Sequence, residues 1–153
     1  MNLRLRPVTE ADLPILFEHQ RDPEAALMAA FSPRDADAFL AHWRRIIADP
    51  SRLALAITDE KTVLGYIASF DADDVRLLGY WIGREYWDRG IGRSAVALFL
   101  ETEMTRPLYA HVVRSNVASV RILERCEFKI VGSTVAAAPT GGDEIEELVF
   151  RLD

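Results

Sequence analysis

The chain has 153 residues, half of them hydrophobic, so it is long enough for one domain with a substantial core and too apolar to be disordered. Its formal net charge of −6 argues against a nucleic-acid partner, which would call for a basic surface, and no apolar run approaches the roughly 20 residues of a membrane span. A single cysteine (Cys126), an N-terminus without the apolar core of a signal peptide and an excess of arginine over lysine lead us to expect a cytoplasmic, bacterial protein.

From the N-terminus onward, the chain first shows the signals of one strand and a group of helices. Residues 3–6 alternate apolar and polar side chains, as a half-buried strand does. Thr9 and Asp12 have the spacing of a capping box, with Asp in place of the usual Glu, and so predict the start of a helix. The helices expected in this region span residues 10–20, 24–31, where the signal is ambiguous, and 35–48, whose apolar stripe is Phe39, Trp43 and Ile47.

Three apolar strands come next, and the turns between them are so short that neighbouring strands should be antiparallel. Gly79 lies inside the third strand, where it predicts a bulge or a close approach of backbone. The helix that follows connects two strands of one sheet, which should therefore run parallel. The remaining expected elements are strands over 53–57, 63–70 and 77–82, a helix over 91–104, a strand over 108–113, a helix over 117–125 and strands over 128–135 and 145–152. Together these elements predict an α/β (α+β) fold of one domain over residues 1–153, with a mixed, mostly antiparallel central sheet and helices on both faces.

A glycine loop, Asp88-Arg89-Gly90-Ile91-Gly92, separates the strand that ends near Gly83 from the next helix. A helix N-terminus presents unpaired backbone N–H groups and the positive end of the helix dipole, so this loop predicts a site for a phosphate or pyrophosphate. Glycine suits the loop because a Cβ atom would block the approach of a ligand to the backbone. The loop and the start of the helix also fit the G-x-G-x-x-G/A pattern of dinucleotide-binding folds. Two observations argue against such a fold: the loop lies mid-chain, and no acidic residue ends the next strand. A plain tight turn without a ligand is the other alternative.

Two segments of the chain, Trp87–Gly92 and residues 116–128, carry a family resemblance. The first, Trp87-Asp88-Arg89-Gly90-Ile91-Gly92, resembles the pyrophosphate loop Q/R-x-x-G-x-G/A of the GNAT superfamily of acyl-CoA-dependent N-acetyltransferases, with Trp87 in place of Gln or Arg. The second resembles the N-x-x-S helix of one branch, which ends in Gly-Phe, with Glu127 in place of Gly. The resemblance covers nearly the whole chain and is closest to the branch that acetylates the N-termini of ribosomal proteins.

This resemblance implies a co-substrate and the residues that hold it. In the family, the strand that ends near Gly83 and the strand over 108–113 splay apart, and acetyl-CoA lies in the gap, with no metal. Backbone groups from Trp81 to Gly83 would bind the pantetheine arm and polarise the thioester carbonyl, and the loop would bind the pyrophosphate. The cofactor-binding residues expected on this basis are Trp81, Ile82, Gly83, Asp88, Arg89, Gly90, Ile91, Gly92, Arg93, Asn116 and Ser119.

The resemblance also implies direct attack of an amine on the thioester, with either a protein N-terminus or a small molecule as the acceptor. His111, on the strand that lines the gap, is the candidate base, unless it faces the other side of the sheet. Ser119 is the candidate to protonate or stabilise the leaving thiolate, because Leu123 stands where many members have a Tyr. Asn116 is expected to orient a water or the pantetheine arm, or else to cap its helix.

The acceptor and the activity itself stay open at this level. Acceptor specificity is expected to lie in residues 20–42 and 136–144, where acidic side chains such as Asp35 and Asp143 could attract a cation. The alternative to an enzyme is a module that binds acyl-CoA without chemistry, as a sensor or partner domain. A monomer and a homodimer are both compatible with the sequence.

Overall fold

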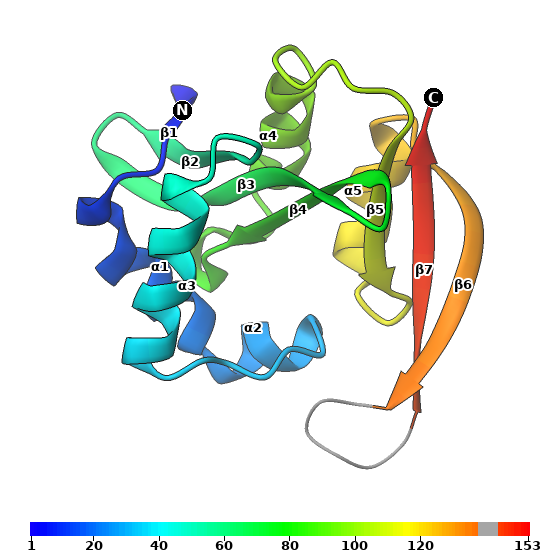
Figure 1. Cartoon of the computed structure of the whole chain (residues 1–153), viewed down its shortest axis with the longest axis horizontal. Coiled ribbons are helices and arrows are strands. Elements are labelled where there is room, and N and C mark those ends of the chain that lie inside the picture. Colours follow the sequence, from blue (N-terminus) through cyan, green and yellow to red (C-terminus); the bar gives the residue numbers. More distant parts are fainter. Residues whose placement is uncertain (138–143) are drawn as a thin grey trace.

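The apolar runs of the sequence form one seven-stranded sheet in the computed structural model, which describes residues 1–137 and 144–153. Its strands are β1 (Leu3–Pro7), β2 (Leu53–Asp59), β3 (Thr62–Ala72), β4 (Val75–Ile82), β5 (Leu108–Val113), β6 (Lys129–Ala137) and β7 (Glu144–Leu152). They lie in the order β1-β2-β3-β4-β5-β7-β6, and every neighbouring pair is antiparallel except β4 and β5, which are parallel (Figure 1). The predicted mixed, mostly antiparallel sheet is therefore confirmed. The loop expected at 139–142 and the acidic Asp143 lie outside the described residues.

Short polar side chains begin several of the helices. The helical elements are η1 (Glu10–Asp12), α1 (Leu13–Arg21), α2 (Pro23–Met28), α3 (Ala36–Ala48), η2 (Arg84–Tyr86), α4 (Ile91–Phe99) and α5 (Val117–Arg125). The Asp12 carboxylate accepts a hydrogen bond from the backbone N–H of Thr9 at 2.8 Å, as the predicted capping box requires. The carboxylates of Asp22 and Asp35 accept bonds from backbone N–H groups in the first turns of α2 and α3. No helix within residues 1–137 and 144–153 is long and apolar enough to cross a membrane.

Helices cover both faces of the sheet, as predicted (Figure 1). Each face has its own apolar core. On one face, Phe99 of α4 and Leu123 of α5 belong to the same core as Phe150 of β7, and all three are fully buried. On the other face, Phe39 and Trp43 of α3 form a core with residues of α1 and the sheet. Burial of one such side chain stabilises a fold by about 1.5–3 kcal/mol, so the two cores hold the sheet rigidly between the two helical layers.

Three details differ from the sequence predictions. Gly79 causes neither a bulge nor a close approach, because β3 and β4 stay in register around it and a Cβ atom built there would meet nothing within 4 Å. The helix expected over 91–104 ends at Phe99, after which the chain turns so that the Glu103 side chain can bind the sheet. On α3, Ile46 packs inward in place of Ile47, which keeps 41% of its surface exposed.

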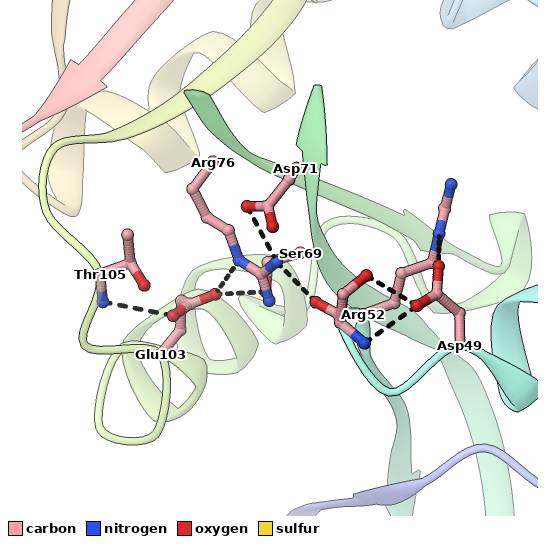
Figure 2. Close-up of polar contacts among 8 residues, drawn as sticks. Asp49, Arg52, Ser69, Asp71, Arg76, Glu103 and Thr105 are labelled. Atoms are coloured by element: carbon pink, nitrogen blue, oxygen red, sulfur yellow. Dashed lines mark hydrogen bonds and ion pairs between the residues drawn. The ribbon is translucent and has the colours of Figure 1, made fainter. Parts of the chain in front are cut away.

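The Glu103 carboxylate is the centre of a buried cluster that joins β3, β4 and the turn after α4 (Figure 2). It accepts hydrogen bonds from the Ser69 hydroxyl on β3 at 2.5 Å and from Nε of Arg76 on β4 at 2.7 Å. The same guanidinium donates to the carbonyl oxygen of Ser51 and to the Asp71 carboxylate. Burial alone would raise the pKa of the Glu103 carboxyl, but the hydrogen bonds from Ser69 and Arg76 outweigh it and hold that pKa below its usual range. The cluster therefore anchors β4 at the end where β4 and β5 are still paired.

Candidate active site

Strands β4 and β5 begin as neighbours and then separate. Their parallel pairing runs from Arg76 opposite Leu108 to Leu78 opposite Ala110, and within the described residues it ends there. β4 continues as far as Ile82 and stays paired with β3 on its other side. Since backbone N–H and C=O groups need partners, the last residues of β4 can offer theirs to a ligand in the gap. This opening is the one that the family resemblance implies.

The glycine loop at this opening is shaped by two different constraints. Gly90 is the N-cap of α4 with φ of 73°, in the left-handed region that favours glycine. Gly92 is required by helix packing, because a Cβ atom there would lie 2.5 Å from Cδ1 of Ile122 on α5. The approach of a ligand to these glycines stays a prediction, and backbone conformation at Gly90 and helix packing at Gly92 are independent reasons for them. The Trp87 indole N–H donates to the carbonyl oxygen of Ile82 at 3.0 Å, so the residue that replaces the family's Gln or Arg ties the loop to β4.

A cleft of about 510 Å³ lies where the loop, the end of β4 and the start of α5 meet. Its lining includes three arginines, Arg93, Arg121 and Arg125, and among the described residues Asp88 is its one acidic side chain. The N-terminus of α4 adds the positive end of a helix dipole. This concentration of positive charge, in a chain whose net charge is −6, fits a ligand that carries several negative charges.

Most of the residues expected to bind acetyl-CoA line this cleft. They are Trp81, Ile82, Asp88, Gly90, Ile91, Gly92, Arg93, Asn116 and Ser119. Gly83 lies outside the lining and is buried beside His19, whose Nε2 would be 2.8 Å from a Cβ atom on that glycine. The Arg89 guanidinium also lies outside the lining and sits over the Tyr86 ring, 5.9 Å from the ring centroid. Gly83 and Arg89 thus border the site without lining it.

One wall of the cleft comes from α2 and the residue that follows it. The Trp81 indole N–H donates to the carbonyl oxygen of His19 at 3.2 Å, which holds the end of α1 against β4. Arg84 Nε donates to the Asp22 carboxylate at 2.8 Å, and this bond holds the pKa of Asp22 below its usual range. These contacts bring an apolar surface to the cleft, formed by Ala25, Met28 and Ala29.

The start of α5 holds two of the predicted catalytic residues. Oδ1 of Asn116 accepts a hydrogen bond from the backbone N–H of Ser119 at 3.3 Å, so Asn116 caps the helix, which is one of its two predicted roles. The Ser119 hydroxyl lies 2.5 Å from the hydroxyl of Tyr80 on β4, a contact that the sequence does not predict. Burial raises the pKa of Tyr80 to about 12, so this phenol stays neutral at physiological pH. Leu123, where many family members have a Tyr, is fully buried in the core.

His111 lies away from this cleft. Its neighbours Ala110 and Val112 belong to the core under α4 and α5, so the alternation of a strand places His111 on the opposite face of the sheet. Its Nδ1 lies 3.2 Å from the Glu147 carboxylate on β7, and 41% of the side chain is exposed. The structure therefore does not bring His111 together with Ser119, and the alternative that it faces the other side of the sheet describes its position.

Four polar cleft residues, Tyr80, Tyr86, Arg121 and Arg125, escape prediction from the sequence. Arg121 and Arg125 stand four residues apart on α5 and share the helix face that lines the cleft. Their spacing after the Asn116 cap is the signal that could have placed them there. Tyr80 falls in a run that reads as an apolar strand, and nothing local distinguishes it. Among the residues that the structure describes, no group of His, Cys, Asp or Glu side chains forms a metal site.

The opening between two parallel strands, the glycine-capped helix beside it and the arginine-lined cleft are the features that the resemblance implies for a transferase that binds an acyl-CoA. Comparison with protein families makes this specific: residues 2–129 match the acetyltransferase (GNAT) domain, and the chain belongs to this family. It is therefore an acetyl-CoA-dependent N-acetyltransferase. A comparison with curated proteins finds no match.

Solved structures share the fold at low sequence identity. Spermidine N-acetyltransferase from Vibrio cholerae, in complex with CoA and spermine, superposes with a TM-score of 0.86 at 18% identity, over 99% of this chain and 95% of that one. An N-acetyltransferase from Staphylococcus aureus Mu50 has a TM-score of 0.82 at 15% identity, over 100% and 99% of the two chains. A protein from Salmonella typhimurium with its cofactor acetyl-CoA has a TM-score of 0.79 at 15% identity, over 100% and 94%. At such identities the likeness shows the fold alone.

Proposed function

We propose that this chain works as one domain over residues 1–153 and transfers the acetyl group of acetyl-CoA to a primary amine in a ternary complex. The observation that supports this most directly is the arginine-lined cleft at the N-terminus of α4. The pyrophosphate would bind the backbone N–H groups of residues 90–93, and Arg93, Arg121 and Arg125 would add charge around the phosphates. The pantetheine arm would lie along Trp81 and Ile82 at the end of β4. When bound, acetyl-CoA supplies an activated acetyl thioester.

Within this proposal, the chain contributes hydrogen-bond donors on both sides of the reacting bond. A backbone N–H at the end of β4 donates to the thioester carbonyl oxygen, where negative charge develops. Ser119 donates to the sulfur as it leaves, and Asn116 keeps the first turn of α5 in place for it. The family's usual Tyr is absent at Leu123, so a polar group from elsewhere must meet the sulfur.

His111 lies on the face of the sheet opposite α5, outside the cleft, so it can serve as the base only for an acceptor amine that approaches from that face, and we propose this approach. A hydrogen bond from Nδ1–H to the Glu147 carboxylate leaves Nε2 of His111 free to accept a proton, directly or through water. An ammonium group must lose a proton before it can attack a thioester, so a base on this face has a chemical purpose. His111 is the described residue of β5 that fits this role.

Two classes of acceptor fit the proposal. The branch that the sequence resembles suggests the free N-terminus of a protein. The Vibrio cholerae structure with spermine suggests a small polyamine, although that likeness rests on the fold. In either case we propose a cytoplasmic enzyme that is a monomer or a homodimer, which light scattering can determine.

The test is the release of CoA from acetyl-CoA against a panel of amines: peptides with free N-termini, spermidine, spermine and aminoglycosides. The matched controls are the same peptides with acetylated N-termini. We expect release that depends on the free amine, with mass spectrometry locating one added acetyl group. Binding of acetyl-CoA without release for any amine would favour the acyl-CoA-binding module, and failure to bind acetyl-CoA would refute the assignment of the cleft.

A further inference from the structure

The Tyr80 and Ser119 hydroxyls meet at the point where the sheet opens. Tyr80 stands two residues beyond Leu78, the last residue of β4 that pairs with β5, and its ring packs against the core on the α5 side. Its hydroxyl lies 2.5 Å from Oγ of Ser119 and 3.5 Å from the carbonyl oxygen of the same residue. Both side chains line the arginine-bearing cleft. Ser119 is thus buried and Tyr80 partly buried, and both are open to a ligand on the side of the cleft.

The direction of this hydrogen bond follows from the groups around it. A serine hydroxyl donates one hydrogen bond and accepts two. The Tyr80 hydroxyl has one proton to donate and lies 2.5 Å from Oγ but 3.5 Å from the carbonyl oxygen of Ser119, so we assign that proton to the shorter contact with Oγ. Its high pKa, about 12, keeps the proton on the phenol. Within the described chain, Tyr80 is the one hydrogen-bond partner of Ser119 Oγ, so the serine's own proton stays free for the cleft.

We propose that Tyr80 is a positioning residue that aims the Ser119 O–H at the sulfur of CoA. The proposal rests on the proposed function, in which Ser119 meets the leaving sulfur. As the amine nitrogen bonds to the acetyl carbon, the carbon–sulfur bond breaks and the sulfur keeps its electron pair. The Ser119 hydrogen bond stabilises that charge, and the proton lost by the nitrogen passes to a base or to water. Because Tyr80 already donates to Oγ, the serine is both oriented and a stronger donor than it would be alone.

This role can be measured without knowing the acceptor, by comparing CoA with desulfo-CoA, which lacks the sulfur. If two linked hydroxyls stabilise a bound thiolate, CoA should gain affinity over desulfo-CoA as the pH passes the range in which a thiol titrates, near 8.5. Calorimetry at pH 7 and pH 9.5 gives the ratio of the two dissociation constants at each pH. We expect this ratio to rise about sevenfold in the native protein, which corresponds to a thiol pKa lowered by about one unit on binding.

The variants separate positioning from general damage. Tyr80→Phe and Ser119→Ala each remove one hydroxyl, and both should abolish most of the rise in the ratio while leaving the affinity for desulfo-CoA within about twofold. Tyr109→Phe on β5, outside the cleft, is the matched control and should keep the full rise. Other charged or titratable groups near the cleft affect both ligands alike, so their effect drops out of the ratio of the two dissociation constants. These groups are Tyr86, Asp88, Arg93, Arg121, Arg125 and Cys126.

The outcomes are distinct for each part of the proposal. A ratio that does not change with pH in the native protein, or a Tyr80→Phe variant that keeps the rise, would overturn the positioning role. Loss of the rise in Tyr80→Phe but not in Ser119→Ala would show that Tyr80 meets the sulfur itself, and would overturn the assigned direction. If neither CoA nor desulfo-CoA binds, the proposed function fails together with the positioning role. If CoA binds and the ratio rises but no amine is acetylated, only the proposed acceptor chemistry fails.

Discussion

Gly65→Ala and Gly79→Ala are substitutions of the same kind, but we expect the first to destabilise the fold and the second to leave its stability unchanged or raise it. Both glycines lie in paired strands, Gly65 on β3 and Gly79 on β4, and neither has a positive φ. A Cβ atom on Gly65 would clash with the carbonyl oxygen of Trp81 and lie 3.0 Å from Cα of Ile82, both of them backbone atoms. A Cβ atom on Gly79 would meet nothing within 4 Å. Backbone cannot rotate aside as a side chain can, so β3 and β4 must move apart in the Gly65→Ala variant and can stay in place in the other.

The magnitudes follow from this difference. Overpacking a well-packed site costs about 1–3 kcal/mol, and an obstruction made of backbone places Gly65→Ala near the upper end. At roughly 2–4 °C per kcal/mol for a chain of this length, the melting temperature should fall by about 6–12 °C. Gly79→Ala meets no obstruction and restricts the unfolded chain, which stabilises by about 0.4–1 kcal/mol. Its melting temperature should stay level or rise by about 1–4 °C.

Thermal unfolding followed by circular dichroism compares the two variants with the native protein, and calorimetry adds the affinity for acetyl-CoA. Gly65→Ala should also weaken binding, because the clash displaces Trp81 and Ile82, which line the cleft. Equal melting temperatures for the two variants would refute the close approach of β3 and β4 at Gly65. A destabilised Gly65→Ala variant with native affinity would instead show that the displacement does not reach the cleft.

Three further predictions concern the loop, the buried ion pair and the candidate base. Gly90→Asp should abolish acetyl-CoA binding in calorimetry, because a carboxylate would face the pyrophosphate, whereas Gly132→Asp on exposed β6 should bind normally; native affinity in a folded Gly90→Asp protein would contradict the site. Glu103→Gln should lower the free energy of unfolding in urea by about 2 kcal/mol at pH 7. Since the pKa of Glu103 is lowered in the folded protein, its stabilisation is present above the unfolded pKa of about 4.3 and is lost as the pH falls through the folded pKa. A difference in unfolding free energy between variant and native protein that does not shrink as the pH falls would count against this. His111→Ala should slow CoA release more at pH 7 than at pH 9, where free amine is more abundant, and an equal loss at both would indicate a structural role.

Features encoded by neighbouring residues could be predicted from the sequence. The strands, the capping interaction of Asp12 with Thr9 and the cap of α5 by Asn116 all depend on contacts within a few positions. The parallel pairing of β4 with β5 followed from the helix between them. Glu127 has a φ of 72°, as expected for a residue that stands in place of the family's glycine after α5.

Features that depend on distant contacts could not be predicted. Tyr80 and Ser119 are 39 positions apart, and their meeting depends on how far β4 runs beyond its last pair with β5. The turn after α4 brings Glu103 to Ser69 and Arg76 on two other strands, and no local pattern predicts these contacts. A glycine in a strand has several uses, and at Gly79 only the surrounding space shows that the local interpretation was wrong.

The separation of β4 from β5 has a consequence for how the protein avoids other chains. Where two strands part, each acquires an unpaired edge, and such edges usually recruit strands from other molecules and lead to aggregation. Here both edges arise in the interior of the sheet, between β3 on one side and β7 on the other. The cleft at the opening is walled by α2 and α5, through residues such as Met28 and Ile122. The backbone N–H and C=O groups on these edges are open to a ligand in the cleft. The fold thus keeps the unpaired edges of β4 and β5 in the interior of the sheet, away from its two outer edges.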